Sequence, residues 1–508
     1  MTAGTDARAG TDARAGTSWF SPSRVVAVAV IASVPAKLLS QRLSDPDLWW
    51  HLRTGQLIAA THRIPHVDVY SYSVPGKRWV VQEWLSELIL HGLNKAFGLW
   101  GIFFWRAAML TGVYLIVAKL IHRRMGEGMG TWALLGLTAY AGSANWTERP
   151  NLFSFLLFGI LLLLLDREDR TIWWFVPIAA LWANLHGMVI LAVGTVAVVA
   201  ATEGLKVGLA WEGANREWAR RLGGVTLASA AATFVNPRGP ELIAYSLRLV
   251  RVVSQLVTEW ASPDFHEITS ILFMALLLIT IGALAMHPSR PDPTDLALTL
   301  AFTVLGLQAA RNLALSSIVL GVVAARYLPG AISAARKHTQ HVERPGAPPS
   351  AILGGLGLLL AIGGLAIVVA GGFPRSDRPI DIVGKQYPIA SLQALRGKSG
   401  VRVFSFDFWA GYLIDQSWPG LHVYHDTRVD VYGPAQTVRY ARAIAALPGW
   451  ERVLDSSCTT HVLVRPQRDP LAEVLRLSPV WRVEREETQA VTFARIAPAL
   501  GCERYPIP

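Results

Sequence analysis

The sequence has 508 residues, of which 52% are apolar and only 16% are charged. Soluble globular proteins carry about 25% charged residues, so this composition excludes a soluble enzyme and a disordered chain. The formal net charge is +11. An excess of this kind can indicate nucleic-acid binding, but here the basic residues lie beside apolar runs, where they set the orientation of a membrane protein. We expect a membrane protein with no nucleic-acid partner.

The first 23 residues repeat the letters AGTDAR and predict a disordered tail. An apolar segment, 25–40, follows. A signal peptide cleaved near Val34-Pro35-Ala36 is one interpretation of this segment. We favour a retained first helix, because the polar motif that follows needs an anchor at the membrane face.

The apolar segments predict one helical membrane domain over residues 24–372, with about 11 spans, although several segments are shorter than the roughly 20 residues of an ideal span. After the first helix the predicted spans are 101–121, 129–144, 151–165, 171–186, 188–205, 222–236, 268–286, 294–310, 313–328 and 350–372. Residues 41–100 form a large first outer loop. Within it, segment 84–99 predicts an interfacial helix, since the polar residues Glu83, Glu87, His91 and Lys95 recur at helical spacing.

The clusters of basic residues between the predicted spans all fall on one side when the first helix begins in the cytoplasm, as expected for a multi-pass inner (plasma) membrane protein. These residues are Lys119, Arg123, Arg124, Arg167, Arg170, Lys206, Arg216, Arg220, Arg221, Arg326, Arg336, Lys337 and Arg344. The opposite, outer loops carry Asp, Glu, His, Arg, Asn and Trp instead. This sidedness predicts chemistry at the outer membrane–water interface.

The C-terminal segment, 373–508, has a different composition and predicts an outer, extracytoplasmic α/β domain. The predicted strands are 401–406, 461–464, 480–484 and 490–495, and the predicted helices are 388–396, 434–447 and 469–477. Both cysteines of the chain, Cys458 and Cys502, lie here. A disulfide can form outside the membrane, but we expect these two to stay unpaired.

The first polar motif is Asp45-Pro46-Asp47, which is followed by Leu48, a Trp pair and His51. Two carboxylates at a membrane face are costly unless they are used or paired. They could bind a divalent cation such as Mg²⁺ or Mn²⁺, or one of them could act as a general base. We predict that Asp45 and Asp47 are catalytic, and that His51 contacts the substrate. The Trp pair suits the membrane interface.

The run from Gly55 to Gly98 adds a Pro-bearing loop, the letters GKRW, an amphipathic helix and FG. With the acidic motif before it, this run resembles the first outer loop of the GT-C glycosyltransferases, which include the protein mannosyltransferase-like and RgtA/B/C/D-like groups. Those groups often carry Asp-Glu where this chain has Asp45-Pro46-Asp47. They often carry Lys/His-Pro-Pro-Leu where this chain has Gln82-Glu83-Trp84-Leu85. The letters NPRG, EWASPDF, DFWAGYL and HDTRVDVYG resemble those of uncharacterised bacterial membrane proteins with the same loop.

The resemblance implies a polytopic enzyme that moves a sugar from a polyprenyl-phosphate donor in the membrane lipid to a lipid, glycan or protein acceptor at the outer face. It also implies that a first-loop acid serves as base or metal ligand. The leaving group of such a reaction is a phosphate, so fixed cations are needed to stabilise the developing charge.

Arginines at the outer ends of predicted spans are the candidates for this phosphate contact, because the guanidinium binds phosphate in a bidentate way. They are Arg149, Arg238 and Arg311, with Arg53 as a weaker candidate that could instead pair with a first-loop acid. The alternative for each is that the side chain reaches toward lipid headgroups.

Four further outer-loop residues are candidates for substrate contact: Glu148, His186, Glu259 and Trp260. Glu148 could pair with its neighbour Arg149 or be a second acid near a metal. For His186, helix capping is favoured over metal or sugar binding. Glu259 and Trp260 could form a sugar-stacking platform, and an interfacial anchor is an equal alternative.

The remaining motifs give weaker indications of function. His62 and His66 have metal-ligand spacing, but Pro65 interrupts a helix there, so we expect no metal site. The charged run 426–430 predicts an internal ion-pair network rather than an acceptor site. There is no Walker A, GxGxxG or HExxH motif.

Two alternative functions stay open: a glycan ligase or polymerase with a polyprenyl-pyrophosphate donor, and a lipid or glycan transporter. Transport ranks lower because the sequence has no evident repeat and its polar residues crowd span ends.

Overall fold

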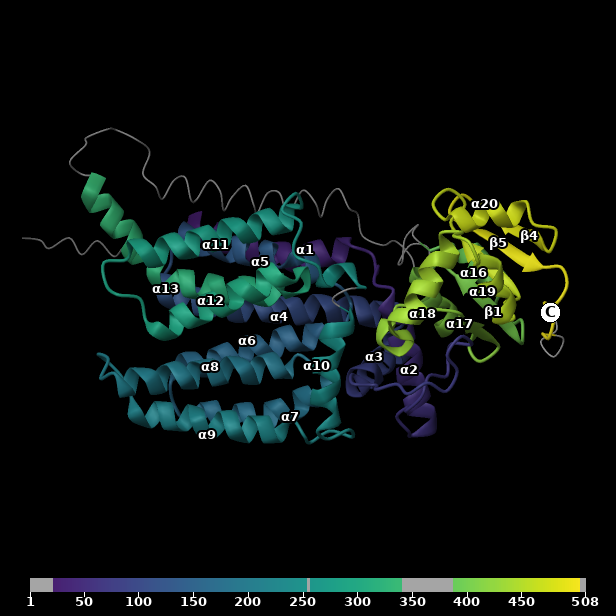
Figure 1. The fold of residues 1–508 in the computed structure, drawn as a ribbon. Coiled ribbons are helices and arrows are strands. Elements are labelled where there is room, and N and C mark those ends of the chain that lie inside the picture. Colours follow the sequence, from purple (N-terminus) through teal and green to yellow (C-terminus); the bar gives the residue numbers. More distant parts are fainter. Residues whose placement is uncertain (1–21, 254–255, 340–386, 503–508) are drawn as a thin grey trace, which may run out of the picture.

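The computed structural model describes residues 22–253, 256–339 and 387–502. The chain forms a long helical bundle with a smaller α/β domain at one end (Figure 1). The predicted class, mostly helical with a C-terminal α/β region, is confirmed. The predicted span 350–372 and nearly all of the predicted N-terminal tail lie outside the described residues.

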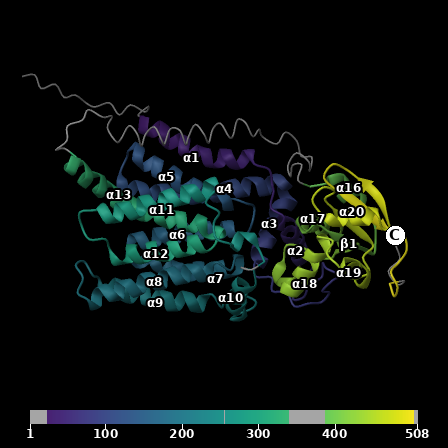
Figure 2. The same ribbon diagram turned by 45° about the horizontal axis from the view of Figure 1, so that its top comes forward.

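Every other predicted span contains a helix, and these helices run side by side along the bundle (Figures 1 and 2). They are α1 (Pro22–Ser40), α4 (Leu99–Met125), α5 (Met129–Ala141), α6 (Asn151–Arg167), α7 (Phe175–Leu185), α8 (Val189–Gly208), α9 (Arg216–Ala232), α11 (Ile268–Met286), α12 (Pro293–Gln308) and α13 (Leu313–Thr339). Short 3₁₀ turns connect some of them: η1 (Ser143–Asn145), η2 (Arg170–Trp174), η3 (Thr258–Trp260) and η4 (Ala310–Asn312).

Among the described residues, 4 helices are long and apolar enough to cross a membrane: Leu99–Met125, Val189–Gly208, Ile268–Met286 and Ala310–Lys337. Others, such as α5 and α7, are shorter than the hydrocarbon core requires. The total of about 11 spans therefore stays a prediction.

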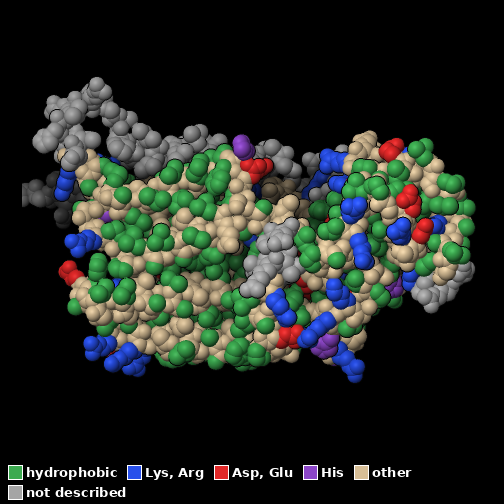
Figure 3. Space-filling model, in the orientation of Figure 1, with side chains coloured by type: hydrophobic (Ala, Val, Ile, Leu, Met, Phe, Trp, Pro, Cys, Tyr) green, Lys and Arg blue, Asp and Glu red, His purple; other side chains and the backbone are tan. Residues whose placement is uncertain are grey.

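The surface of the bundle is consistent with a membrane location. Its long side carries hydrophobic side chains and few charges, whereas blue basic side chains gather at the end away from the α/β domain (Figure 3). That end contains the last turns of α4 and α6 and the first turn of α9, where the sequence places its basic loops. Which end faces the cytoplasm stays a prediction.

Two helices of the first outer loop lie between the bundle and the α/β domain: α2 (Asp47–Thr61) and α3 (Trp84–Phe97). They pack closely at Gly55, where an added Cβ would lie 2.0 Å from the carbonyl oxygen of Glu87. A larger residue at position 55 would push the two helices apart. The loop between them, 62–83, returns along the α/β domain through a bridge between Ser71 and Val423. A further helix, α10 (Glu241–Val253), lies across this end of the bundle.

The C-terminal domain is built on a five-stranded sheet of order β2-β1-β3-β5-β4. Its strands are β1 (Val401–Ser405), β2 (Leu421–Val423), β3 (His461–Val464), β4 (Trp481–Glu486) and β5 (Val491–Arg495). The neighbours of β1 pair with it in parallel, and β5 pairs antiparallel with both β3 and β4. Its helices are α16 (Ile389–Ala394), α17 (Asp407–Ser417), α18 (Val429–Ile444), α19 (Trp450–Ser456) and α20 (Pro470–Arg476). The sequence did not predict β2, α17 or α19; β2 has only 3 residues, too few to show alternation.

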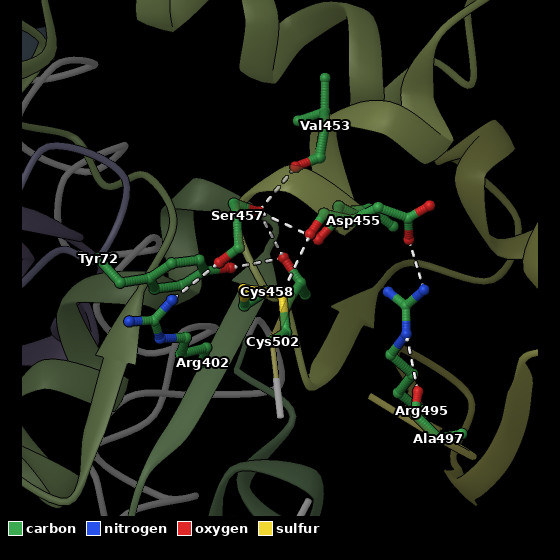
Figure 4. The surroundings of a disulfide bond; sticks show 11 residues. Tyr72, Arg402, Val453, Asp455, Ser457, Cys458, Arg495, Ala497 and Cys502 are labelled. Atoms are coloured by element: carbon green, nitrogen blue, oxygen red, sulfur yellow. Dashed lines mark hydrogen bonds and ion pairs between the residues drawn. A yellow bond between two sulfur atoms is a disulfide. The ribbon is translucent and has the colours of Figure 1, made fainter. Parts of the chain in front are cut away.

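Cys458 and Cys502 form a disulfide (Figure 4), so the expectation of unpaired cysteines was wrong. Their separation of 44 residues is uninformative by itself. The pairing of β3 with β5 brings the two segments together: the amide of Arg495 donates to the carbonyl of Thr460 at 2.9 Å. Sequence spacing does not show such a tertiary contact.

The α/β domain is fixed to the first outer loop where the acidic motif begins. A Cβ at Gly411 in α17 would lie 2.5 Å from the carbonyl oxygen of Pro46. Beside this contact, the Trp49 ring packs edge-on against Tyr412 and Tyr387, with centroids 4.8 and 5.9 Å apart. The domain therefore covers the start of α2 directly.

Candidate functional site

A cavity of about 960 Å³ lies where the bundle, the first outer loop and the α/β domain meet. Its polar and aromatic lining includes Asp47, Trp50, His51, Trp79, Gln82, Glu83, Glu87, Arg149, Asn151, His186, Tyr245, Glu259, Trp260, Arg311, Asp407, Thr427, Arg428 and Asp430. Many of these residues are far apart in the sequence. The cavity has the size of a small-molecule site.

Arg149 joins three carboxylates at the cavity wall. Its Nε donates to Asp45, its Nη2 lies 3.2 Å from Asp47, and its Nη1 donates to both oxygens of Glu259 at 3.0 and 2.9 Å. Arg311 lies 3.4 Å from the same Glu259. Five of the outer-loop residues that the sequence singled out, Asp45, Asp47, Arg149, Glu259 and Arg311, are therefore brought together, although they come from four separate loops.

A buried ion pair behind the cavity holds the acidic motif. Glu148 accepts hydrogen bonds from the backbone amides of Ser44 and Asp45, at 2.5 and 2.8 Å, and pairs with Arg106 at 2.8 Å. Arg106 also donates to the carbonyl of Leu38 at the end of α1. The alternative that Glu148 pairs with its neighbour Arg149 was wrong. Glu148 does not line the cavity.

Asp45 is itself almost inaccessible, and burial raises its pKa to about 7 even though the Arg149 charge lowers it. One of its oxygens accepts from the amide of Asp47 at 2.9 Å. It therefore supports the wall of the cavity, while Asp47 lines the cavity directly.

The residues present do not fit a divalent cation at the acidic motif. The oxygens of Asp45, Asp47 and Glu259 that would be its ligands are occupied by the guanidinium of Arg149. Over the part of the chain that the structure describes, no group of three or more His, Cys, Asp or Glu residues could hold a metal ion.

The predicted phosphate-binding arginines have different locations. Arg311 lines the cavity from the 3₁₀ turn η4, directly before α13, and stacks on Trp260, with 4.2 Å between the guanidinium carbon and the ring centroid. Arg238 instead donates to the carbonyl of Trp79 at 3.1 Å. Arg53 donates to the carbonyl of Trp418 in the α/β domain. Neither Arg238 nor Arg53 lines the cavity.

The α/β domain contributes a second buried arginine. Arg428 pairs with Asp426 at 2.6 Å and with Asp68 of the first outer loop at 2.9 Å. The predicted ion-pair network in segment 426–430 is confirmed for this pair. Next to it, Asp430 accepts a hydrogen bond from Tyr245 of α10. These contacts close the cavity with residues from outside the bundle.

Four more titratable side chains that line the cavity form a second cluster. His186 Nε2 lies 3.2 Å and His51 Nε2 lies 3.5 Å from the two carboxyl oxygens of Glu83. His51 Nδ1 lies 3.2 Å from Glu87. The sequence predicted substrate contact for His51 and capping for His186. It gave no role to Glu83 or Glu87, although their four-residue spacing placed both on one helix face.

Comparison with known proteins shows the fold. The chain resembles the archaeal oligosaccharyltransferase AglB from Archaeoglobus fulgidus, solved with an inhibitory peptide and a dolichol-phosphate, with a TM-score of 0.58 and 12% identity over 87% of this chain and 69% of that one. The apo structure of the Archaeoglobus fulgidus oligosaccharyltransferase matches with a TM-score of 0.56 and 13% identity, over 88% of this chain and 70% of that one. The arabinofuranosyltransferase AftD from Mycobacteria matches with a TM-score of 0.53 and 14% identity, over 93% of this chain and 40% of that one.

These proteins are polytopic membrane glycosyltransferases of the GT-C class, and the present chain has their fold. The predicted resemblance is confirmed at this level. No family model matches the sequence, and no curated protein matches it.

Proposed function

We propose that this protein is a GT-C-type membrane glycosyltransferase. It moves a sugar from a polyprenyl-phosphate donor to a lipid, glycan or protein acceptor at the outer face of the inner membrane. In this proposal the N-terminus is cytoplasmic and the α/β domain extracytoplasmic. The observation that carries the proposal is the placement of the cavity: it lies at the end of an apolar bundle and contains both arginines and carboxylates.

The donor phosphate is bound by Arg311, with Arg149 beside it. Arg311 lies in the first turn of the segment Ala310–Lys337, which is long enough to cross the membrane. The end of a membrane span is the depth at which the phosphate of a lipid-linked donor lies. Among the described residues Arg311 has one carboxylate partner, Glu259 at 3.4 Å, whereas Arg149 contacts three. Arg311 can therefore exchange its partner for a phosphate at lower cost. A guanidinium at the leaving oxygen stabilises the charge that develops there.

The aromatic and amide side chains of the cavity suit a sugar. Trp260 and Trp79 line the cavity, each with a guanidinium over its ring, and aromatic rings pack well against the CH-rich face of a sugar. Asn151 offers hydrogen-bond groups. In this proposal Asp45 and Asp47 orient Arg149 and balance its charge. The dolichol-phosphate in the AglB structure supports a lipid-linked donor for the fold.

Carrier specificity tests the proposal. The purified full chain is assayed with radiolabelled undecaprenyl-phosphate pentoses and hexoses, and in parallel with undecaprenyl-pyrophosphate glycans, using a washed cell-envelope fraction as acceptor. Transfer from the monophosphate carriers is expected. Transfer only from the pyrophosphate carriers would identify a ligase or polymerase. Carrier movement across proteoliposomes without a covalent product would identify a transporter.

The Arg311→Ala variant tests the assigned phosphate contact. It is expected to weaken binding of undecaprenyl phosphate at least about tenfold, which corresponds to one charge-assisted hydrogen bond. Arg123→Ala, at the distal end of α4, is the matched control. Equal affinity in the two variants would contradict the assignment.

A further inference from the structure

Glu83 is a further carboxyl group that lines the cavity, and its partners differ from those of Asp47 and Glu259. Glu83 is the N-cap residue of α3, and its carboxyl group faces two imidazoles rather than an arginine. Its side chain is 14% exposed, against 1% for Glu87 one turn further along. Of these two carboxyl groups, Glu83 is therefore the one that a substrate can reach.

The fold fixes Glu83 from two sides. Trp84 Nε1 donates to Asn184 at 3.0 Å, and Ser86 donates to the carbonyl of Leu185 at 2.7 Å. These bonds tie the start of α3 to the end of α7, next to His186. On the other side, the close approach at Gly55 places α2 and its His51 against α3. Such a fixed position is what a catalytic side chain requires.

The surrounding hydrogen bonds define the proton on His186. Its Nδ1 accepts from the amide of Met188 at 3.4 Å and lies 2.8 Å from the hydroxyl of Ser154, which in turn accepts from Trp182. The proton of the neutral ring is therefore on Nε2, which donates to Glu83. His186 orients this carboxyl group.

His51 lies between two carboxyl groups and can donate to only one of them when neutral. Burial lowers the pKa of His51 to about 3 and raises the pKa of Glu87 well above its ordinary value. Burial thus favours the protonated form of Glu87, and in that form Glu87 donates to His51 Nδ1. The His51 Nε2–H group then faces Glu83. Both imidazoles present N–H groups to one carboxylate.

The carboxylates of the first motif, Asp45 and Asp47, already have other partners. One oxygen of Asp47 accepts from Trp50 Nε1 at 3.2 Å and from Thr427, and the other contacts Arg149. Asp45 does not line the cavity. The oxygens of Asp47 are therefore already occupied by donors, and Asp45 lies out of reach of a substrate in the cavity.

We propose that Glu83, rather than Asp45 or Asp47, is the general base that removes the proton of the acceptor, and that His51 and His186 are its positioning residues. This inference rests on the proposed function. The acceptor O–H bond breaks and its proton moves to Glu83. The acceptor oxygen forms a bond to the anomeric carbon of the sugar, and the bond from that carbon to the phosphate oxygen breaks. The electron pair leaves with the polyprenyl phosphate.

The electrostatics of the cavity agree with this role. Burial raises the pKa of Glu83 to about 8; Asp47 and Asp430 raise it further, while Arg311 and Arg149 lower it. His51, His186, Glu87 and Tyr245 are further titratable groups that interact with it. A base is most effective when its pKa is close to the working pH. Transfer is therefore expected to increase as the pH rises toward about 8.

The test uses the detergent-solubilised full chain and the monophosphate donor panel described above. Glu83→Gln is expected to lower transfer at least about 100-fold, the usual contribution of a general base, while binding of undecaprenyl phosphate is unchanged. Glu83→Asp is expected to recover part of the rate. Glu217→Gln, at an exposed residue of α9, is the matched control. Asp47→Asn is expected to keep measurable transfer and to shift the rise with pH toward lower pH, since one cause of the raised pKa is removed.

The results separate this proposal from the proposed function. A wild-type protein that transfers no sugar from any monophosphate carrier would overturn the proposed function and the base with it. A functional wild type with Glu83→Gln retaining more than a tenth of its rate and an unchanged pH profile would overturn the base alone. The same holds if Asp47→Asn abolishes transfer while Glu83→Gln does not.

Discussion

Two groups of charged residues lie at opposite ends of α8 and α12, and their comparison shows what makes one of them a site. The cavity cluster consists of Asp45, Asp47, Arg149, Glu259 and Arg311. The distal cluster consists of Glu203, Lys206, Asp292, Asp295 and Arg326. The two are separated by most of the length of α8, roughly 26 Å at 1.5 Å per residue. Each contains three carboxylates and two cations.

Their charge composition is therefore the same, and only their surroundings differ. In the distal cluster, hydroxyl groups donate to the same carboxylate oxygens that the cations contact: Thr294 donates to Glu203 at 2.9 Å, and Tyr327 donates to Asp295 at 2.7 Å. None of its five members lines the cavity. In the cavity cluster, Asp47, Arg149, Glu259 and Arg311 do. Access to a cavity, rather than the presence of buried charge, is the difference that points to function.

The largest expected effect concerns the ion pair behind the cavity cluster. Arg106→Leu leaves the carboxylate of Glu148 buried without a cation, and we expect the free energy of unfolding to fall by about 3–5 kcal/mol. Unfolding in mixed detergent micelles measures it. Arg123→Leu breaks a pair in which the arginine is 43% exposed, and is expected to cost less than about 1 kcal/mol. Equal losses in the two variants would contradict the structural role of Arg106.

Arg149→Ala tests whether the cavity cluster acts as a unit. It leaves three carboxylates without their common partner and removes a cation next to the donor phosphate. We expect sugar transfer from the undecaprenyl-phosphate donors to fall by about 100-fold. Arg221→Ala in α9 is the control and should leave transfer unchanged. A retained rate in Arg149→Ala would show that this arginine has only a structural function.

The pH dependence of stability distinguishes the buried acids of the cavity wall. The folded-state pKa values of Glu83 and Asp45, about 8 and about 7, lie above their ordinary values, chiefly because of burial. Between those ordinary values, near about 4, and about 8, the folded state binds more protons than the unfolded state, so stability falls as the pH rises. The melting temperature is expected to fall by a few degrees from about pH 5 to about pH 8 in this window. Glu83→Gln should reduce the slope, and Glu217→Gln should not; equal slopes would show that Glu83 titrates normally.

The smallest effect is expected in the distal cluster. The Arg326 side chain is 50% exposed, so Arg326→Ala should lower the free energy of unfolding by less than about 1 kcal/mol. Transfer should stay at the wild-type rate, since this residue is far from the cavity. A loss of transfer comparable to that of Arg149→Ala would remove the distinction between the two clusters.

The sequence alone determined much of the architecture. Apolar segments separated by clusters of basic residues predicted the helices of the bundle, because a membrane-facing helix must be apolar over its length. The change in composition after the bundle predicted the α/β region. The polar loops identified Asp47, Arg149, Glu259 and Arg311, which the structure brings to one cavity.

Only the tertiary structure decided which partners these residues have. That Arg149 contacts three carboxylates, that Glu148 pairs with Arg106 and that the cysteines form a disulfide depends on segments more than 40 residues apart. Glu83 likewise takes its imidazole partners from two other segments, α2 and the end of α7. Local periodicity records which face of a helix is polar. It contains no information about what that face meets, because packing between distant segments sets burial, pairing and proton affinity.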